Sequence, residues 1–262
     1  MTLKTYNDSP QRLDRRKFLV DLESKIETLQ AHKLGLPQLK ELMVEIQGMS
    51  LNGATSRKPF FFVPRSDLPE PDEERIKYLQ WVFDLDEQDT CFTSPSDRAR
   101  QFEVSWTRYT LRRAYDEAAR NRPWSKKCVG DYMYWKTVYE CTQPEFGVFH
   151  MTDMPGRGFP HMMAVIYNDL EVENQEILRG ELLIILRMMI GQFRLRRLLG
   201  HMIIPVMIIS FMGKSARAIE AYFDGERLIL GCTDLYSTRH QTATALKDLG
   251  GLYLGTPIGD TA

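Results

Sequence analysis

The sequence lacks the features that mark several large classes of protein. Lys and Arg number 34 against 35 Asp and Glu, so the strong basic excess of a typical nucleic-acid binder is missing. The four cysteines stand far apart in the chain, without the CxxC pair that zinc and redox sites use. We therefore expect no nucleic-acid partner, no zinc, and reduced thiols in a cytoplasmic protein.

Long apolar runs are also absent. The two most apolar stretches, Leu182–Phe193 and Met202–Met212, are 12 residues long or shorter, and three arginines lie between them. A helix needs about 20 apolar residues to cross a bilayer. The N-terminus carries no apolar segment of the kind found in secretion signals. We expect no membrane partner, and we interpret the two stretches as a buried helix and a buried strand.

The common motifs for cofactors and hydrolysis are missing as well. The chain contains no GxxxxGK[ST], GxGxxG, GxSxG or HExxH pattern, and Gly213-Lys214-Ser215 has only the last letters of a phosphate loop. This predicts a protein that works without a bound nucleotide, flavin or metal.

The chain does contain enough apolar residues to form a core, 43% of the total, and these residues recur at regular spacing. Leu22, Ile26 and Leu29 recur at helical spacing, and a second apolar stripe runs through residues 39–46. Pro37 separates the stripes, so we predict two helices in an N-terminal arm, residues 1–48. The stripes can pack on the same chain, or residues 11–48 can pair with a second copy in a homo-oligomer.

A proline-rich connecting segment, residues 49–72, follows the arm. Its insert Phe60–Val63 is too apolar for a free linker, so we expect it to dock into the core or to form an edge strand. The main domain then covers residues 73–262. The patterns predict helices over residues 73–85, 95–121 and 126–140.

The pattern changes after Pro144 from helical to strand-like. An Asp224-Gly225 loop between two apolar runs is the strongest hairpin signal in the chain. The fold class predicted is α+β, with an N-terminal helical region followed by an antiparallel sheet packed on one long buried helix. The expected elements are strands over 147–150, 162–167 and 202–212, the long helix over 173–199, a last helical turn over 242–249, and a mobile glycine-rich tail.

Four polar residues gather around one loop between two predicted strands: His150, Asp153, Arg157 and His161. The two imidazoles and the carboxylate can act as general acid and base, and Arg157 can hold a substrate anion. The same His/Asp/His set can hold a divalent metal, although its spacing matches no metal motif. The alternative is a solvated loop whose polar groups bond to their own backbone.

An aromatic stripe lies upstream of this loop. Tyr132, Trp135 and Tyr139 follow one another at helical spacing. These side chains can line an apolar substrate pocket and orient a ligand with their hydroxyls. The same spacing also predicts ordinary core packing.

The segment from Glu181 to Leu230, with GHMIIPVMIISFMG and then IEAYFDGERLIL, resembles lineage-restricted proteins of filamentous fungi over about a fifth of the chain. Some of these proteins are labelled nuclease-like and others lie in secondary-metabolite gene clusters. The resemblance implies a helix and three strands, as at the start of the αβββαβ core of restriction-endonuclease-like proteins. That family needs an acid on the second strand and ExK on the third. Here HMIIPVMIISF has no acid and Glu220-Ala221-Tyr222 has tyrosine in place of lysine, so the scaffold would be degenerate.

These observations lead to one principal hypothesis and two alternatives. The principal hypothesis is a protein that binds or converts an apolar small molecule without a cofactor, in fungal secondary-metabolite biosynthesis as the resemblance implies. The first alternative is a non-catalytic helical interaction protein. The second is a degenerate restriction-endonuclease-like binder without its catalytic acid and lysine.

Overall fold

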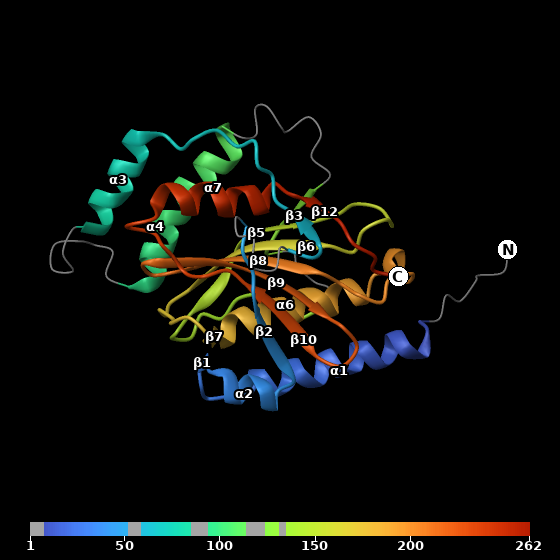
Figure 1. Ribbon diagram of the computed structural model, residues 1–262. Helices are drawn as coiled ribbons and strands as arrows, with labels where there is room; N and C mark the ends of the chain where they lie inside the picture. The colour runs from blue at the N-terminus through green and yellow to red at the C-terminus, as the bar shows by residue number, and fades with distance from the viewer. Residues whose placement is uncertain (1–7, 52–58, 85–93, 114–123, 131–134) are drawn as a thin grey trace.

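A mixed eight-stranded sheet forms the centre of the protein (Figure 1). The computed structural model describes residues 8–51, 59–84, 94–113, 124–130 and 135–262. Seven strands follow one another across the sheet, and β11 (Tyr236–Ser237) pairs with β9 beside them. In order across the sheet they are β2 (Val44–Gly48), β10 (Leu228–Cys232), β9 (Ser215–Phe223), β8 (Val206–Met212), β6 (Met162–Asn168), β5 (Phe146–Asp153) and β4 (Ser125–Lys127).

The predicted α+β class is confirmed, and most neighbouring strands are antiparallel as expected. Two pairs are parallel instead, β6 with β8 and β10 with β2. Helix α6 (Arg179–Phe193) connects β6 to β8, and a crossover through a helix brings the next strand back in the same direction. The long helix therefore accounts for the parallel β6–β8 pair, whereas the β10–β2 pair arises because a strand from the N-terminal part of the chain joins the sheet edge.

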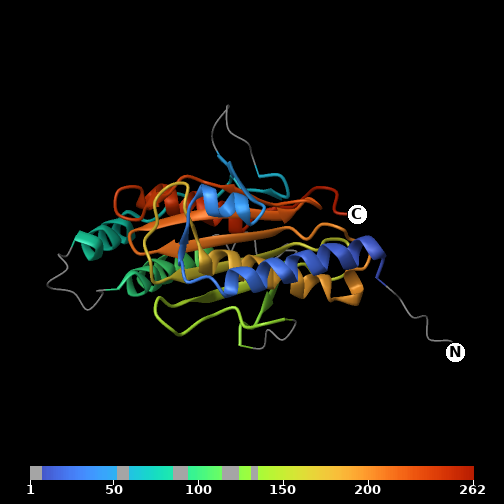
Figure 2. The same ribbon diagram turned by 90° about the horizontal axis from the view of Figure 1, so that it is seen from below.

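Helices cover both faces of the sheet (Figures 1 and 2). Helices α1 (Pro10–Glu27) and α6 lie on one face. Helices α3 (Glu73–Asp84), α4 (Pro95–Thr107) and α7 (Thr242–Tyr253) lie on the other, with a π-helix, Arg108–Arg113, continuing α4. All of β8 is buried because its alternate side chains enter the two different cores.

Helix α1 packs along α6, so the apolar stripe of the N-terminal arm is covered by the same chain. Ser9 caps the helix by accepting from Arg12 N at 3.2 Å, and proline occupies its first position. Leu19, Leu22 and Ile26 are buried in the core that the two helices share with the sheet.

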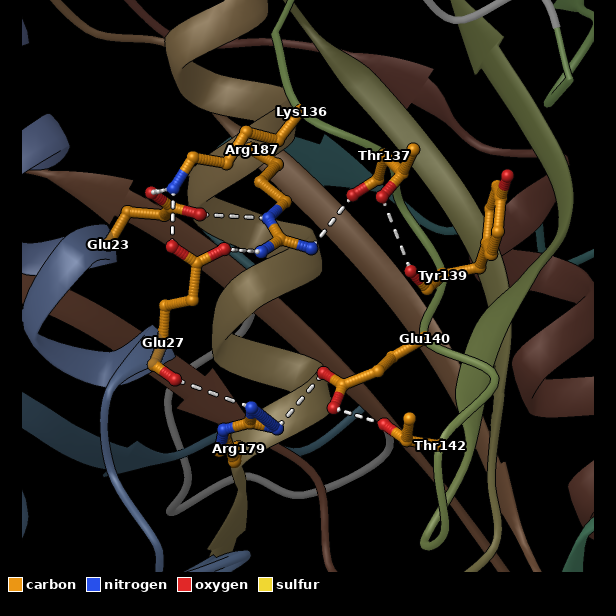
Figure 3. Close-up of polar contacts among 9 residues, drawn as sticks. All are labelled: Glu23, Glu27, Lys136, Thr137, Tyr139, Glu140, Thr142, Arg179 and Arg187. Atoms are coloured by element: carbon orange, nitrogen blue, oxygen red, sulfur yellow. Dashed lines mark hydrogen bonds and ion pairs between the residues drawn. The ribbon is translucent and has the colours of Figure 1, made fainter.

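Helix α6 is buried at all fifteen of its positions, as its all-round apolar sequence predicts. It is shorter than the predicted 173–199, because its backbone departs from the helix after Phe193 and only a short 3₁₀ turn, Arg196–Leu198, follows. Its two buried arginines, Arg179 and Arg187, are paired with acids of α1 and of the segment before β5 (Figure 3).

The hairpin at Asp224-Gly225 is confirmed, with β9 and β10 joined antiparallel from Phe223 to Leu228. The loop holds four residues rather than two. Asp224 Oδ1 accepts from the backbone N of Glu226 at 2.7 Å and of Arg227 at 2.8 Å, and Gly225 takes φ = 117°. Asp224 thus accepts hydrogen bonds from two backbone N–H groups of the turn, and Gly225 adopts the positive φ that the turn requires.

One predicted helix is shorter than expected, and another does not form over the residues that the structure describes. The second stripe of the arm gives only the short helix α2 (Leu36–Glu41), after which Met43 at φ = 57° turns the chain into β2 at the sheet edge. Of the predicted helix 126–140, residues 131–134 lie outside the described residues, and the others form β4 and non-helical backbone that ends in a bridge between Glu140 and Phe146. In both places pairing with the sheet outweighs helical periodicity.

Two small sheets complete the fold. β1 (Lys33–Leu34) pairs with β7 (Ile177–Leu178), and β3 (Phe62–Val63) pairs with β12 (Thr256–Pro257). The second pair confirms the expected edge strand in the proline-rich segment and shows that the tail expected to be mobile is held in place. Within the described ranges, no helix has both the length and the apolar character needed to cross a membrane.

Candidate functional site

A groove of about 730 Å³ runs beside helix α7 on the face opposite α6. We call it the α7 groove. One wall is formed within the segment 59–66 by Pro59 and residues 62–66, and the other is the side of α7 formed by residues 243–251. Leu51, Glu70 and Ile258 complete the lining.

A buried carboxylate holds the first wall in place. Glu220 on β9 is 2% exposed and accepts from the backbone N of Phe60 and of Phe61, each at 2.7 Å. Hydrogen bonds to a charged acceptor are stronger than those between neutral groups. The charge of Glu220 therefore fixes the start of the wall against the sheet.

The wall also lies directly on α7. Arg65 N donates to Gly251 O at 2.9 Å. A Cβ at position 251 would stand only 2.7 Å from Arg65 O, so glycine is needed for this close approach. The groove thus depends on contact between two segments far apart in the sequence.

The charged groups that line the groove are all engaged with partners in the protein. Lys247 forms an ion pair with Glu70, and Arg65 Nη2 lies 2.7 Å from Asp67 Oδ2. Asp248 accepts from Tyr236 Oη at 3.1 Å. Burial, followed by the nearby Asp248 charge, raises the pKa of Tyr236, so its hydroxyl stays protonated and remains a donor. The groove therefore has one largely apolar wall, and its charged groups each have a partner within the protein.

His161 of the predicted cluster lies behind the groove wall. Its Nε2 donates to Ile258 O at 3.0 Å, and its ring meets Phe62 edge-on at 5.2 Å between centroids. Burial lowers the pKa of His161 to about 4, so the ring is neutral at physiological pH. In this position it supports two residues that line the groove, and its predicted acid–base role stays a prediction.

The structure does not bring the rest of the cluster to the same place. His150 points toward α4, where its Nε2 lies 2.6 Å from Glu103 Oε1 and 3.2 Å from Thr107 Oγ1. Asp153 lies toward the end of α6, where it pairs with Arg197 at 2.9 Å. The sheet separates His150 from Asp153 because they stand on opposite faces of β5.

The last member of the cluster, Arg157, likewise has a separate environment. The Arg157 side chain is exposed, and its backbone O accepts from His201 Nε2 at 2.7 Å. Lys127 Nζ adds a second cation 3.3 Å from Asp153. Among the residues that the structure describes, no three His, Cys, Asp or Glu side chains gather closely enough to hold a metal ion.

The described residues of the predicted aromatic stripe, Trp135 and Tyr139, do not line the α7 groove. Tyr132 is outside the described residues. The Arg194 guanidinium lies over the Trp135 ring, 4.9 Å from the ring centroid. Tyr139 is 45% exposed. Arg187 Nη1 holds this segment by donating to Thr137 O at 2.8 Å (Figure 3). Trp135 therefore packs against the core that contains α6, and Tyr139 is exposed, so neither ring lines the groove.

Sequence reasoning missed the residues that build the groove. Phe60–Val63 was expected to dock, and it does, but nothing in the pattern identifies Glu220 as its partner. Lys247 and Asp248 fall within a predicted helical turn whose exposed side looks like any solvated helix face. The pairing of these elements depends on tertiary contacts that sequence spacing does not encode.

Comparison with known proteins adds no assignment to this geometry. No protein-family model matches the chain, and no curated protein or solved structure is significantly similar to it.

Proposed function

We propose that this protein binds an uncharged, largely apolar small molecule in the α7 groove. The observation that carries the proposal is the combination of one largely apolar wall, which includes Phe62 and Val63, with charged groups that already have partners within the protein. The volume of about 730 Å³ falls in the range of roughly 300–1,000 Å³ typical of small-molecule sites.

Because the charged groups on the rim already have partners, the groove favours an apolar ligand over a charged one. A charged ligand would have to compete with the Lys247–Glu70 pair and with the Tyr236–Asp248 hydrogen bond. An apolar ligand needs no such exchange and gains roughly 25 cal/mol for each Å² of apolar surface that it buries. Apolar products of secondary metabolism, the class that the fungal resemblance implies, fit these requirements.

A titration with the uncharged fluorescent probe N-phenyl-1-naphthylamine tests the proposal. Its emission should rise on binding to the wild-type protein and saturate. Thr244→Trp places an indole on the exposed groove side of α7 and should weaken binding at least about tenfold, or about 1.4 kcal/mol. Ser24→Trp, on the exposed side of α1, is the matched control and should bind as the wild type does.

The same two variants define the results that would contradict the proposal. Equal affinity for the probe in Thr244→Trp and Ser24→Trp, with both proteins folded by circular dichroism, would place the ligand elsewhere. Loss of binding in both variants would point to unspecific adsorption on apolar surface.

A second candidate, the degenerate restriction-endonuclease-like binder, draws support from chain order. Helix α6 is followed by the antiparallel β8–β9–β10 meander and by α7. However, Glu220 of β9 is committed to two backbone donors, and the near-neutral charge of the chain offers little attraction for phosphates. Retention of a DNA duplex at physiological salt in a gel-shift assay would favour this candidate over the first.

A further inference from the structure

A second cavity, of about 390 Å³, lies on the same face of the sheet between α3, α4 and α7. We call it the α3–α4 pocket. Arg75 and Tyr78 line it from α3, and Ser105 lines it from the last turn of α4. Arg108 and Tyr109 line it from the start of the π-helix. None of the residues that line the α7 groove takes part in this lining.

The pocket is built where the helix changes its winding. The last α-helical residue of α4 is Thr107, and the π-helix begins at Arg108. π-helical segments are rare, and they occur frequently at functional sites. The π-helix therefore makes the pocket a candidate site, but it does not indicate which ligand binds there.

A buried hydroxyl points to a missing partner. Ser105 is 1% exposed, and its Oγ has no hydrogen-bond partner in the described part of the chain. A buried polar group left unpaired costs about 1–3 kcal/mol, so natural proteins rarely keep one without a reason. A ligand in the pocket can supply the acceptor that the Ser105 hydroxyl lacks.

Two arginines at the pocket remain available for an anion. Arg75 and Arg108 form no ion pair with any residue that the structure describes, and the Arg75 guanidinium lies 5.5 Å from the Tyr78 ring centroid. Of the two acids in the lining, Asp72 accepts from Glu74 N at 3.0 Å and caps α3. Glu74 itself is exposed. The lining therefore carries two arginines that lack an ion pair among the described residues and two carboxylates, Asp72 and the exposed Glu74.

Aromatic rings supply the remaining part of the wall. Tyr109 is fixed by its hydroxyl, which donates to Pro69 O at 2.6 Å. Burial raises the pKa of Tyr109 to about 12, so the ring carries no charge that would repel an anion. Leu246 of α7 adds an aliphatic surface.

We propose that the α3–α4 pocket binds an aromatic carboxylate. The carboxylate faces Arg108 and Arg75, the ring lies against Tyr78 and Tyr109, and the Ser105 hydroxyl donates to a ligand oxygen. Guanidinium groups suit this role because their planar N–H fork matches a carboxylate. This site is distinct from the α7 groove and does not rest on the function proposed for it.

Calorimetric titration with naphthalene-2-carboxylate and with naphthalene-2-carboxamide tests the proposal. The two probes share a ring and differ in charge, so the carboxylate should bind the wild-type protein at least about tenfold more tightly. Arg108→Gln should weaken the carboxylate about 5- to 30-fold and leave the carboxamide unchanged. Arg227→Gln, which removes an exposed arginine outside the pocket, is the matched control and should change neither affinity.

Ser105→Ala provides an independent readout. It removes a hydroxyl that is unpaired in the free protein, so the melting temperature should stay the same or rise. The affinity for the carboxylate should nevertheless fall about three- to tenfold, because the bound ligand loses its donor. Equal binding of the two probes, or an Arg108→Gln variant that binds the carboxylate as the wild type does, would overturn the proposal.

Discussion

Replacement of Arg187 by methionine should weaken the attachment of α1 to the rest of the protein. Arg187 is buried in α6 and forms ion pairs with Glu23 Oε1 at 2.9 Å and Glu27 Oε1 at 2.7 Å, both on α1 (Figure 3). Its third donor, Nη1, holds Thr137 O. One substitution therefore removes partners from two segments at once.

The magnitude follows from the burial of Glu23. Its side chain is 0% exposed, so loss of Arg187 leaves the carboxylate with Lys136 Nζ, at 2.9 Å, as its remaining cation in Figure 3. Removing one member of a buried pair typically costs about 3–5 kcal/mol, because the other charge stays buried without compensation. Replacing both members by apolar residues is often close to neutral. Arg187→Met should thus cost several kcal/mol, and the double variant Arg187→Met, Glu23→Leu should recover most of it.

Equilibrium urea unfolding of the single and double variants measures these differences. Arg227→Met is the matched control, since it breaks an exposed pair, with Glu45 at 2.6 Å, worth about 1 kcal/mol or less. The reasoning is refuted if Arg187→Met costs no more than Arg227→Met. A double variant no more stable than the single one would equally show that the buried Glu23 charge is not the cause.

Three further variants test the groove wall and the titrating groups. Glu220→Ala should lower both stability and N-phenyl-1-naphthylamine affinity, because the backbone N–H groups of Phe60 and Phe61 lose a charged acceptor. Unchanged probe affinity would show that the wall held by Glu220 does not take part in binding. The pKa of His161 falls on folding, so the unfolded chain binds more protons and stability should decrease as pH drops from about 6.5 to about 4; urea unfolding of His161→Phe should show a flatter slope over this range. The pKa of Glu27 is lowered chiefly by its hydrogen bond to Lys136, so its contribution is present above its ordinary pKa and is lost on acidification; Glu27→Gln should reduce the acid sensitivity seen below about pH 5.

The sequence predicts the buried centre of the fold well. Helix α6, strand β8 and the Asp224 hairpin are each specified by local signals: an all-round apolar helix, an apolar run and a turn pair. Residues 126–140 show the limit of such signals. Their aromatic spacing fits a helix, yet Thr137 O and Lys136 are bound by α6 and α1, and these tertiary contacts favour the non-helical backbone of residues 135–140.

The candidate site was much harder to predict. Closeness in sequence suggested that His150, Asp153 and His161 act together, but alternation along β5 places His150 and Asp153 on opposite faces of the sheet. The α7 groove instead joins residues 59–66 to residues 243–251, which no local pattern links. Register and packing, which depend on the whole chain, decide which side chains meet.

Photoaffinity labelling with an uncharged alkyl diazirine, mapped by peptide mass spectrometry, tests the central claim most directly. The apolar α7 groove predicts adducts concentrated in residues 59–66 and 243–251, and competition by N-phenyl-1-naphthylamine should remove them. Adducts spread evenly over the chain, or concentrated on α1 and α6 and unaffected by the competitor, would contradict small-molecule binding in this groove.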